Sequence, residues 1–248
     1  MLELKNLTFE VPLADGSKET KRIIDDLSLT IPDGRFTVIT GPNGGGKSTL
    51  AKLIMGVERA TSGQILLDGE DITDLSISER AKKGIGYGFQ QPARFKGMKV
   101  KKLLDIAAGK KLPMLACNEY LAKVGLCSAS YLTREVDKNL SGGEVKRIEI
   151  ATVLARGTKL SVFDEPEAGI DLWSFQNLIQ VFERMRENTN GSIIIISHQE
   201  RILNIADEIV VIADGQIVKQ GPKEEILPEL LGTSSAVDAC SMLYKGAR

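Results

Sequence analysis

One glycine-rich segment, residues 41–49, constrains the fold of this chain more than any other feature. It lies between an apolar, β-prone run at 36–40 and a stretch with helical spacing at 48–55. It matches the pattern GxxxxGK[ST], in which backbone N–H groups turn inward around phosphate oxygens and the following helix N-terminus adds its dipole. The predicted phosphate-binding residues are Gly41, Pro42, Asn43, Gly44, Gly45, Gly46, Lys47, Ser48 and Thr49. The segment therefore predicts a strand–loop–helix unit that binds a nucleotide.

An acidic pair supplies the second half of this chemistry. The apolar run 160–163 ends in Asp164 and Glu165, and ligands of α/β sheets bind at the carboxyl ends of the strands. We expect Ser48 and Asp164 to hold Mg²⁺, Lys47 to contact the β- and γ-phosphates, and Glu165 to polarise the attacking water. Two acids after a strand are weak evidence alone, but they gain weight beside a phosphate loop.

The alternation of strand and helix patterns predicts an α/β fold. Strands at 2–10 and 21–31 flank a turn at 14–17, and a hairpin is expected at 209–219. Between them, strands alternate with helices, which favours a largely parallel sheet with helices on both faces. From 98 to 139 helical patterns replace strand patterns. We expect a nucleotide-binding core of 1–97 and 140–248, with 98–139 as an inserted helical subdomain.

A second motif separates the families that share a phosphate loop. Residues 140–144 read Leu-Ser-Gly-Gly-Glu, which resembles the LSGGQ signature of the ABC ATPase superfamily. The resemblance implies a P-loop ABC ATPase core with an N-terminal antiparallel β-subdomain, and ATP and Mg²⁺ as cofactors. It also implies that Ser141, Gly142 and Gly143 contact the γ-phosphate held by another copy. Small residues at a helix start suit this role because they expose N–H donors to an anion.

Three further segments follow in the order of that family. Gln90 resembles the Q-loop glutamine that senses Mg²⁺ and the attacking water, and Asp171 lies in a segment resembling the D-loop that crosses the dimer interface. His198, the single histidine, resembles the switch residue that contacts the γ-phosphate. The resemblance implies that Gln90 and His198 join Lys47 and Glu165 as catalytic residues. It further implies that Gln90 helps to hold Mg²⁺ and that Asp171 acts on ATP in trans.

Two departures from the general pattern point to a subfamily. Val11 stands where many members carry an adenine-stacking aromatic residue, and the signature ends in Glu144. The stretch 140–150 is similar to the LSGGExKRxEI pattern of SufC, the ATPase subfamily of Suf-type iron–sulfur cluster assembly. This resemblance implies that ATP hydrolysis drives a conformational change in a SufB/SufD-like soluble scaffold protein, with ATP-dependent homodimerisation.

An alternative function shares every catalytic residue named above. The chain could be the nucleotide-binding subunit of a membrane ABC transporter; Glu144, its Lys146–Arg147 neighbours and Val11 favour the assembly ATPase. A non-catalytic switch or a DNA-associated ATPase is disfavoured, because Glu165 and His198 are present and neither a coiled-coil arm nor a basic stripe is found.

Composition sets the remaining limits. With 32 basic and 33 acidic residues, there is no electrostatic case for nucleic acid as a partner. No run approaches the about 20 apolar residues of a membrane helix, and the start lacks signal-peptide features. Cys117, Cys127 and Cys240 are scattered, so we expect reduced thiols without a zinc or iron–sulfur site. These patterns predict a cytoplasmic protein without direct membrane insertion.

Overall fold

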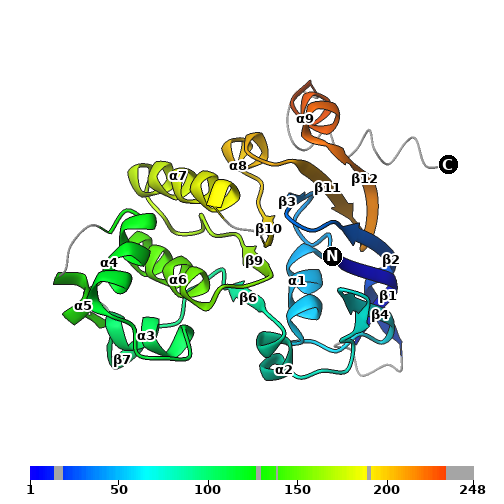
Figure 1. Cartoon of the computed structure of the whole chain (residues 1–248). Coiled ribbons are helices and arrows are strands. Elements are labelled where there is room, and N and C mark those ends of the chain that lie inside the picture. Colours follow the sequence, from blue (N-terminus) through cyan, green and yellow to red (C-terminus); the bar gives the residue numbers. More distant parts are fainter. Residues whose placement is uncertain (14–18, 127–129, 138, 189–190, 233–248) are drawn as a thin grey trace. The chain divides into compact units, whose positions relative to one another are not determined.

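The computed structural model describes residues 1–13, 19–126, 130–137, 139–188 and 191–232. The expected turn at 14–17 lies outside them. The chain divides into two compact units, one built from 1–83 and 192 onward, the other from 84–191 (Figure 1). The predicted helical subdomain, 98–139, falls inside the second unit. Each unit is described separately below.

The first unit opens with an antiparallel sheet. Its strands are β1 (Leu2–Pro12), β2 (Thr20–Ile31), β4 (Ser62–Leu67) and β5 (Glu70–Asp71), in the order β2-β1-β4-β5. Leu2 and Leu4 of β1 are buried while Glu3 is half-buried and Lys5 is exposed, so apolar side chains take alternate positions at the strand start. The predicted antiparallel β-subdomain is confirmed.

A largely parallel sheet carries the phosphate loop. In this unit β10 (Ser192–Ile196) and β11 (Glu208–Ala213) both run parallel to β3 (Phe36–Thr40), and β12 (Gln216–Pro222) pairs antiparallel with β11. Every residue of β3 and β10 is buried, as expected for strands covered on both faces. The helices of the unit are α1 (Lys47–Met55), α2 (Ile77–Lys82), α8 (Glu200–Asn204) and α9 (Lys223–Gly232).

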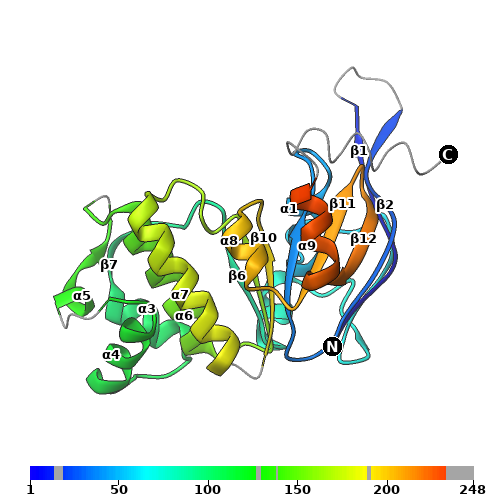
Figure 2. The ribbon, with the colours of Figure 1, turned by 90° about the horizontal axis from the view of Figure 1, so that it is seen from above.

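The second unit joins two parallel strands to a group of helices. Strand β6 (Ile85–Gly88) pairs with β9 (Leu160–Asp164), and α6 (Gly142–Arg156) packs on β6. Helix α7 (Leu172–Asn188) lies beside α6 (Figure 2). The remaining elements are β7 (Phe95–Lys99), α3 (Val100–Ala107), α4 (Met114–Lys123), α5 (Ser130–Thr133) and β8 (Glu135–Val136).

The sequence patterns missed some of these elements. Strands were not expected between 98 and 139, and this was wrong, because β8 lies in this range and pairs with β7, which ends at Lys99. Strand β6 escaped notice because two of its four residues are glycine. A Cβ at Gly86 would lie 2.6 Å from Thr158, and one at Gly88 would lie 2.5 Å from the Phe163 ring. Close packing therefore requires glycine in a strand that propensity alone disfavours.

Candidate active site

The phosphate loop connects β3 to α1 in the first unit and is shaped by glycines. Gly41 has φ +131°, and a Cβ there would lie 2.0 Å from the carbonyl oxygen of Ile212. Gly45 accepts a hydrogen bond from the Gly215 N–H at 3.0 Å. The loop thus rests against the β11–β12 turn at distances that exclude side chains, leaving its backbone as the lining.

Helix α1 begins without a side-chain cap. Its N-cap is Gly46, with φ 103°, and a hydrogen atom in place of a side chain cannot accept from the first N–H groups of the helix. The buried Lys47 side chain folds over the loop, its ammonium donating to the Gly41 and Pro42 carbonyls at 2.9 and 2.8 Å. A glycine-lined loop, an uncapped helix start and an adjacent ammonium fit the phosphate groups of ATP.

The strand ends bring the predicted histidine to the same edge of the sheet. The Ser197 N–H donates to the Ile39 carbonyl at 3.1 Å, and Gln199 N–H donates to the buried Ser197 hydroxyl at 3.0 Å. His198, between them, is exposed. Since β3 and β10 are parallel neighbours, His198 and the start of the phosphate loop both follow carboxyl ends of adjacent strands.

In the second unit, β9 delivers the two predicted acids. Asp164 is buried and accepts a hydrogen bond from the Tyr87 hydroxyl at 3.2 Å. Burial raises the pKa of Tyr87, and the charge of Asp164 adds to the rise, so Tyr87 remains a donor. The next residue, Glu165, has φ 41°, an unfavourable backbone conformation of the kind that gathers at functional sites.

The predicted Q-loop glutamine and the second acid meet directly. The Gln90 side-chain amide donates a hydrogen bond to the Glu165 carboxylate. The carbonyl of Glu165 also accepts from Ala168 N–H at 3.0 Å. An amide and a carboxylate in contact form a pair that can orient a water molecule and accept its proton. The sequence predicted that both residues act in the same reaction, and in the structure their side chains are hydrogen-bonded to each other.

The predicted signature residues form the start of α6. Ser141 is its N-cap: its hydroxyl accepts from the Glu144 N–H at 3.2 Å, while the Glu144 carboxylate accepts from Ser141 N–H at 2.7 Å. Glu144 also accepts from Tyr131 at 2.6 Å and Arg134 at 3.1 Å. Burial opposes ionisation of Glu144, but these hydrogen bonds and the Arg134 charge outweigh it and lower its pKa to about 2. Glu144 is therefore ionised, and its negative charge is balanced by Arg134 and by hydrogen-bond donors within the unit.

The two signature glycines lie against the predicted D-loop. A Cβ on Gly142 would lie 3.2 Å from the Gly169 carbonyl oxygen, and one on Gly143 would lie 2.8 Å from Ser174. Asp171 accepts from the N–H groups of Trp173 and Ser174, both at 3.0 Å. The Ser174 bond in particular lowers the pKa of Asp171. Asp171 therefore caps the start of α7, and the signature and D-loop segments pack together.

Several charged residues make buried contacts that the sequence did not predict. Lys146 and Glu149 form a buried pair on α6, and both hydrogen-bond the backbone of Phe89. Burial lowers the pKa of Lys146 and raises that of Glu149, and each partner's charge opposes the shift of the other. The guanidinium of Arg80 donates to the carbonyls of Leu53 and Ile54 at the end of α1. No sequence pattern marks the contacts to Phe89, Leu53 and Ile54, because each joins segments far apart in the chain.

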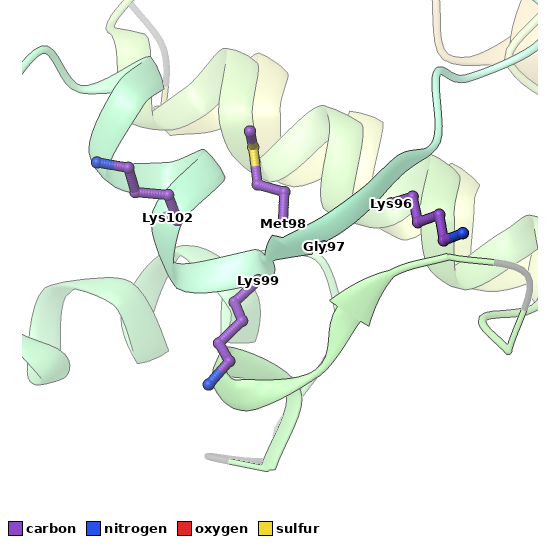
Figure 3. Close-up of a pocket in the computed structure, with 5 residues that line it drawn as sticks. All are labelled: Lys96, Gly97, Met98, Lys99 and Lys102. Carbon is purple, nitrogen blue, oxygen red and sulfur yellow. The ribbon is translucent and has the colours of Figure 1, made fainter.

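A pocket at β7 and the start of α3 carries three lysines but no anion site. It has a volume of about 320 Å³ and is lined by Lys96, Gly97, Met98, Lys99 and Lys102. The three ammonium groups point in different directions (Figure 3), whereas an anion needs donors that converge.

The cysteine prediction is tested at one position. The structure describes Cys117, which is free and buried in α4, and burial raises the pKa of its thiol. Cys127 and Cys240 lie outside the described residues. Within the described part of the chain, we found no helix with the length and apolar character needed to span a bilayer.

Known proteins match this chain over most of its length. The family model described as "ABC transporter" matches residues 24–168. An uncharacterized ABC transporter ATP-binding protein of Methanocaldococcus jannaschii is 38% identical, covering 83% of this chain and 85% of its own. The probable ATP-dependent transporter ycf16 of Pyropia yezoensis is 35% identical over 80% of this chain and 85% of its own.

A solved structure supports the fold. It is the ADP conformation of an ATP-binding cassette of an ABC transporter, with a TM-score of 0.77 and 26% sequence identity. The match covers 99% of this chain and 98% of the other. The predicted ABC ATPase fold is thereby confirmed.

Proposed function

This chain belongs to the ABC transporter family and is an ATPase that uses ATP and Mg²⁺, and from that premise we propose that it is the nucleotide-hydrolysing subunit of a membrane transporter. The observation that carries the proposal is the match, over at least 80% of this chain, to one protein named an ABC transporter ATP-binding protein and another named a probable ATP-dependent transporter. A membrane-embedded partner subunit would convert the conformational change of the ATPase into transport.

The proposed reaction assigns a task to each site residue. Lys47 and the N–H groups of 41–49 bind the phosphates, and Ser48, Gln90 and Asp164 hold Mg²⁺. Glu165, oriented by Gln90, accepts a proton from the attacking water. His198 contacts the γ-phosphate. These roles rest on the family pattern and on the contacts within each unit.

Two copies would act together in this scheme. Each ATP lies between one copy's phosphate loop and the other copy's residues 141–143 and Asp171. The closed pair binds ATP more tightly than the open pair, so ATP closes the pair and hydrolysis reopens it. The motion is transmitted to the partner subunits.

The second candidate is the SufC-like assembly ATPase, which acts on a SufB/SufD-like soluble scaffold. Its support is the resemblance of residues 140–150 to the SufC pattern, whose charged residues make defined contacts in this chain. Glu144 closes the α6 cap, while Lys146 and Glu149 form the buried pair at Phe89. The names of the relatives favour the transporter.

A pull-down from the native host separates the two candidates. The tagged chain is recovered from separated membrane and soluble fractions, and its partners are identified by mass spectrometry. A multi-helix membrane protein as stoichiometric partner is the expected result. A soluble scaffold able to carry an iron–sulfur cluster would contradict the transporter proposal and establish the second candidate.

The two-copy scheme has its own test. Glu165→Gln should retain ATP but stop hydrolysis, so an ATP-bound dimer accumulates and is detected by light scattering after size-exclusion chromatography. Glu183→Gln, on the exposed side of α7, is the control and should not trap a dimer. A Glu165→Gln variant that binds ATP yet stays monomeric at saturating ATP would sink the two-copy scheme.

A further inference from the structure

The buried ion pair on α6 lowers the stability of the fold unless its charged groups also bind other parts of the protein. Lys146 and Glu149 are one turn apart on the helix, with side chains 2% and 14% exposed, and their charged atoms lie 3.4 Å apart. Withdrawing two ions from water carries a large desolvation cost, and their mutual attraction offsets it only when further hydrogen bonds satisfy the remaining polar atoms. Those further bonds identify what the pair holds.

The charged side chains of Lys146 and Glu149 both form hydrogen bonds with the backbone of Phe89. Glu149 accepts a hydrogen bond from Phe89 N–H at 3.1 Å, and the Lys146 ammonium donates to the Phe89 carbonyl. Phe89 follows β6 directly and lies outside any strand, so its backbone groups have no ladder partner to fix them. The pair therefore determines where the chain runs as it leaves the sheet.

The next residue is the Q-loop glutamine. Gln90 follows Phe89 and donates its side-chain hydrogen bond to Glu165. Tight packing keeps this region in register: a Cβ on Gly88 would lie 2.5 Å from the Phe163 ring and 3.6 Å from Glu149. A continuous series of contacts thus runs from α6 through Phe89 and Gln90 to Glu165.

The same helix begins with the signature residues. Ser141 caps α6, and Lys146 and Glu149 lie about 8–12 Å further along it at 1.5 Å rise per residue. A helix this short moves as one piece, so a displacement at its start reaches the buried pair.

We propose that Lys146 and Glu149 are positioning residues, which fix the Phe89 backbone to the signature helix and so set where Gln90 holds Glu165. Movement of the signature helix then displaces or aligns the hydrolytic pair. This inference rests on the proposed catalytic role of Glu165 and is independent of the transporter or scaffold partner.

The decisive variant removes both charges together, as Lys146→Met with Glu149→Leu in the full chain. Replacing a buried ion pair by apolar side chains of similar size is often neutral or stabilising, so the protein should fold with a melting temperature close to wild type. Phe89 loses both anchors. We expect kcat for ATP hydrolysis to fall about 10- to 100-fold, because small misplacements at a site of chemistry have effects of that size.

The division between KM and kcat separates positioning from stability. KM for ATP should stay within about twofold of wild type, since phosphate binding belongs to 41–49 in the other unit. A double variant that hydrolyses ATP with wild-type kcat would overturn the proposal. Should the double variant not fold, Glu149→Gln decides, because it keeps the shape but weakens the grip on Phe89: a lowered kcat at unchanged KM supports the proposal, and a wild-type kcat overturns it.

A matched control perturbs α6 without touching Phe89. Thr152→Ala removes the hydroxyl that donates to the Glu149 carbonyl at 2.6 Å, so it should lower the melting temperature and leave kcat unchanged. If this control lost as much kcat as the double variant, Lys146 and Glu149 would act only by stabilising α6, and the positioning proposal would be wrong. Glu165→Gln in the same assay tests the premise separately: a wild-type kcat there would refute the catalytic role of Glu165, whatever the pair does.

Discussion

Helices α1 and α6 begin at the predicted phosphate-binding motifs of this chain, and their N-termini are capped differently. Helix α1 begins at Gly46, in a left-handed conformation with φ 103° and no side-chain oxygen. Helix α6 begins at Ser141, in an extended conformation with φ −63° and a complete capping box with Glu144.

The difference shows how similar residues serve different tasks. A helix start offers its first N–H groups to an anion only where no side chain satisfies them. In α1 the N-cap glycine has no side chain to satisfy them, as the predicted phosphate site requires. In α6 the Ser141–Glu144 box satisfies two backbone N–H donors internally, so the helix start is stabilised before any ligand arrives. The start of α1 has no side-chain cap, and the start of α6 has a complete one.

Removing the ammonium at the uncapped start should have the largest effect. Lys47→Met keeps most of the side-chain volume but loses the charge that reaches phosphate oxygens. We expect ATP affinity to fall about 10- to 100-fold, the equivalent of one charged hydrogen bond, measured by isothermal titration calorimetry. The exposed Lys52 of the same helix gives the control Lys52→Met. Equal affinity of Lys47→Met and wild type would refute the assignment of Lys47.

Adding a side chain at the uncapped start of α1 should have the second-largest effect, lowering both stability and ATP binding. A Cβ at Gly46 would lie 2.7 Å from the Ile23 carbonyl oxygen, at a φ that disfavours L residues. Gly46→Ala should lower stability by about 1–3 kcal/mol and weaken ATP binding, as followed by thermal melts with and without ATP. Gly44 also has a positive φ but faces open space, so Gly44→Ala should cost less. If both variants melt alike, the close contact with Ile23 is not what requires glycine.

Opening the capping box should have a moderate effect. Ser141→Ala should destabilise the protein by about 1 kcal/mol, a shift in melting temperature of about 2–4 °C for a chain of this size, and should lower kcat. The matched control is Ser76→Ala, which opens the Ser76–Glu79 capping box of α2 with a similar loss of stability and no loss of kcat. A fall in kcat in the control would mean that Ser141 acts through stability alone.

The contribution of the Glu144 charge should depend on pH. The folded pKa of Glu144 is about 2, below its usual value of 4.5. A depressed carboxylate pKa contributes stability that is complete above about pH 4.5 and disappears as the pH falls through about 2. Glu144→Gln retains a capping side chain and lacks this contribution. The difference in unfolding free energy between wild type and variant should therefore shrink from pH 6 to pH 2, and a constant difference would contradict the assigned pKa.

The sequence located most of the candidate site because phosphate chemistry needs particular residues at fixed local spacing. The loop at 41–49, the acids after 160–163 and the helix start at 141–143 are each determined within about ten neighbouring residues, and each lies where it was expected in the secondary structure. The direct contact of Gln90 with Glu165 was outside that range, since 75 positions separate the two residues.

By itself, therefore, the sequence determined the strand–loop–helix unit of the phosphate loop from local spacing, and the ABC ATPase fold with the order of its motifs through the resemblance to that family. Only the tertiary structure decided three features: the glycine-bearing strand β6, the ion pair of Glu144 with Arg134, and the hydrogen bonds of Lys146 and Glu149 to the Phe89 backbone. These depend on burial and on contacts between distant segments. Packing alone decides whether a charged residue in a helix faces water or is withdrawn into the protein to hold another segment in place.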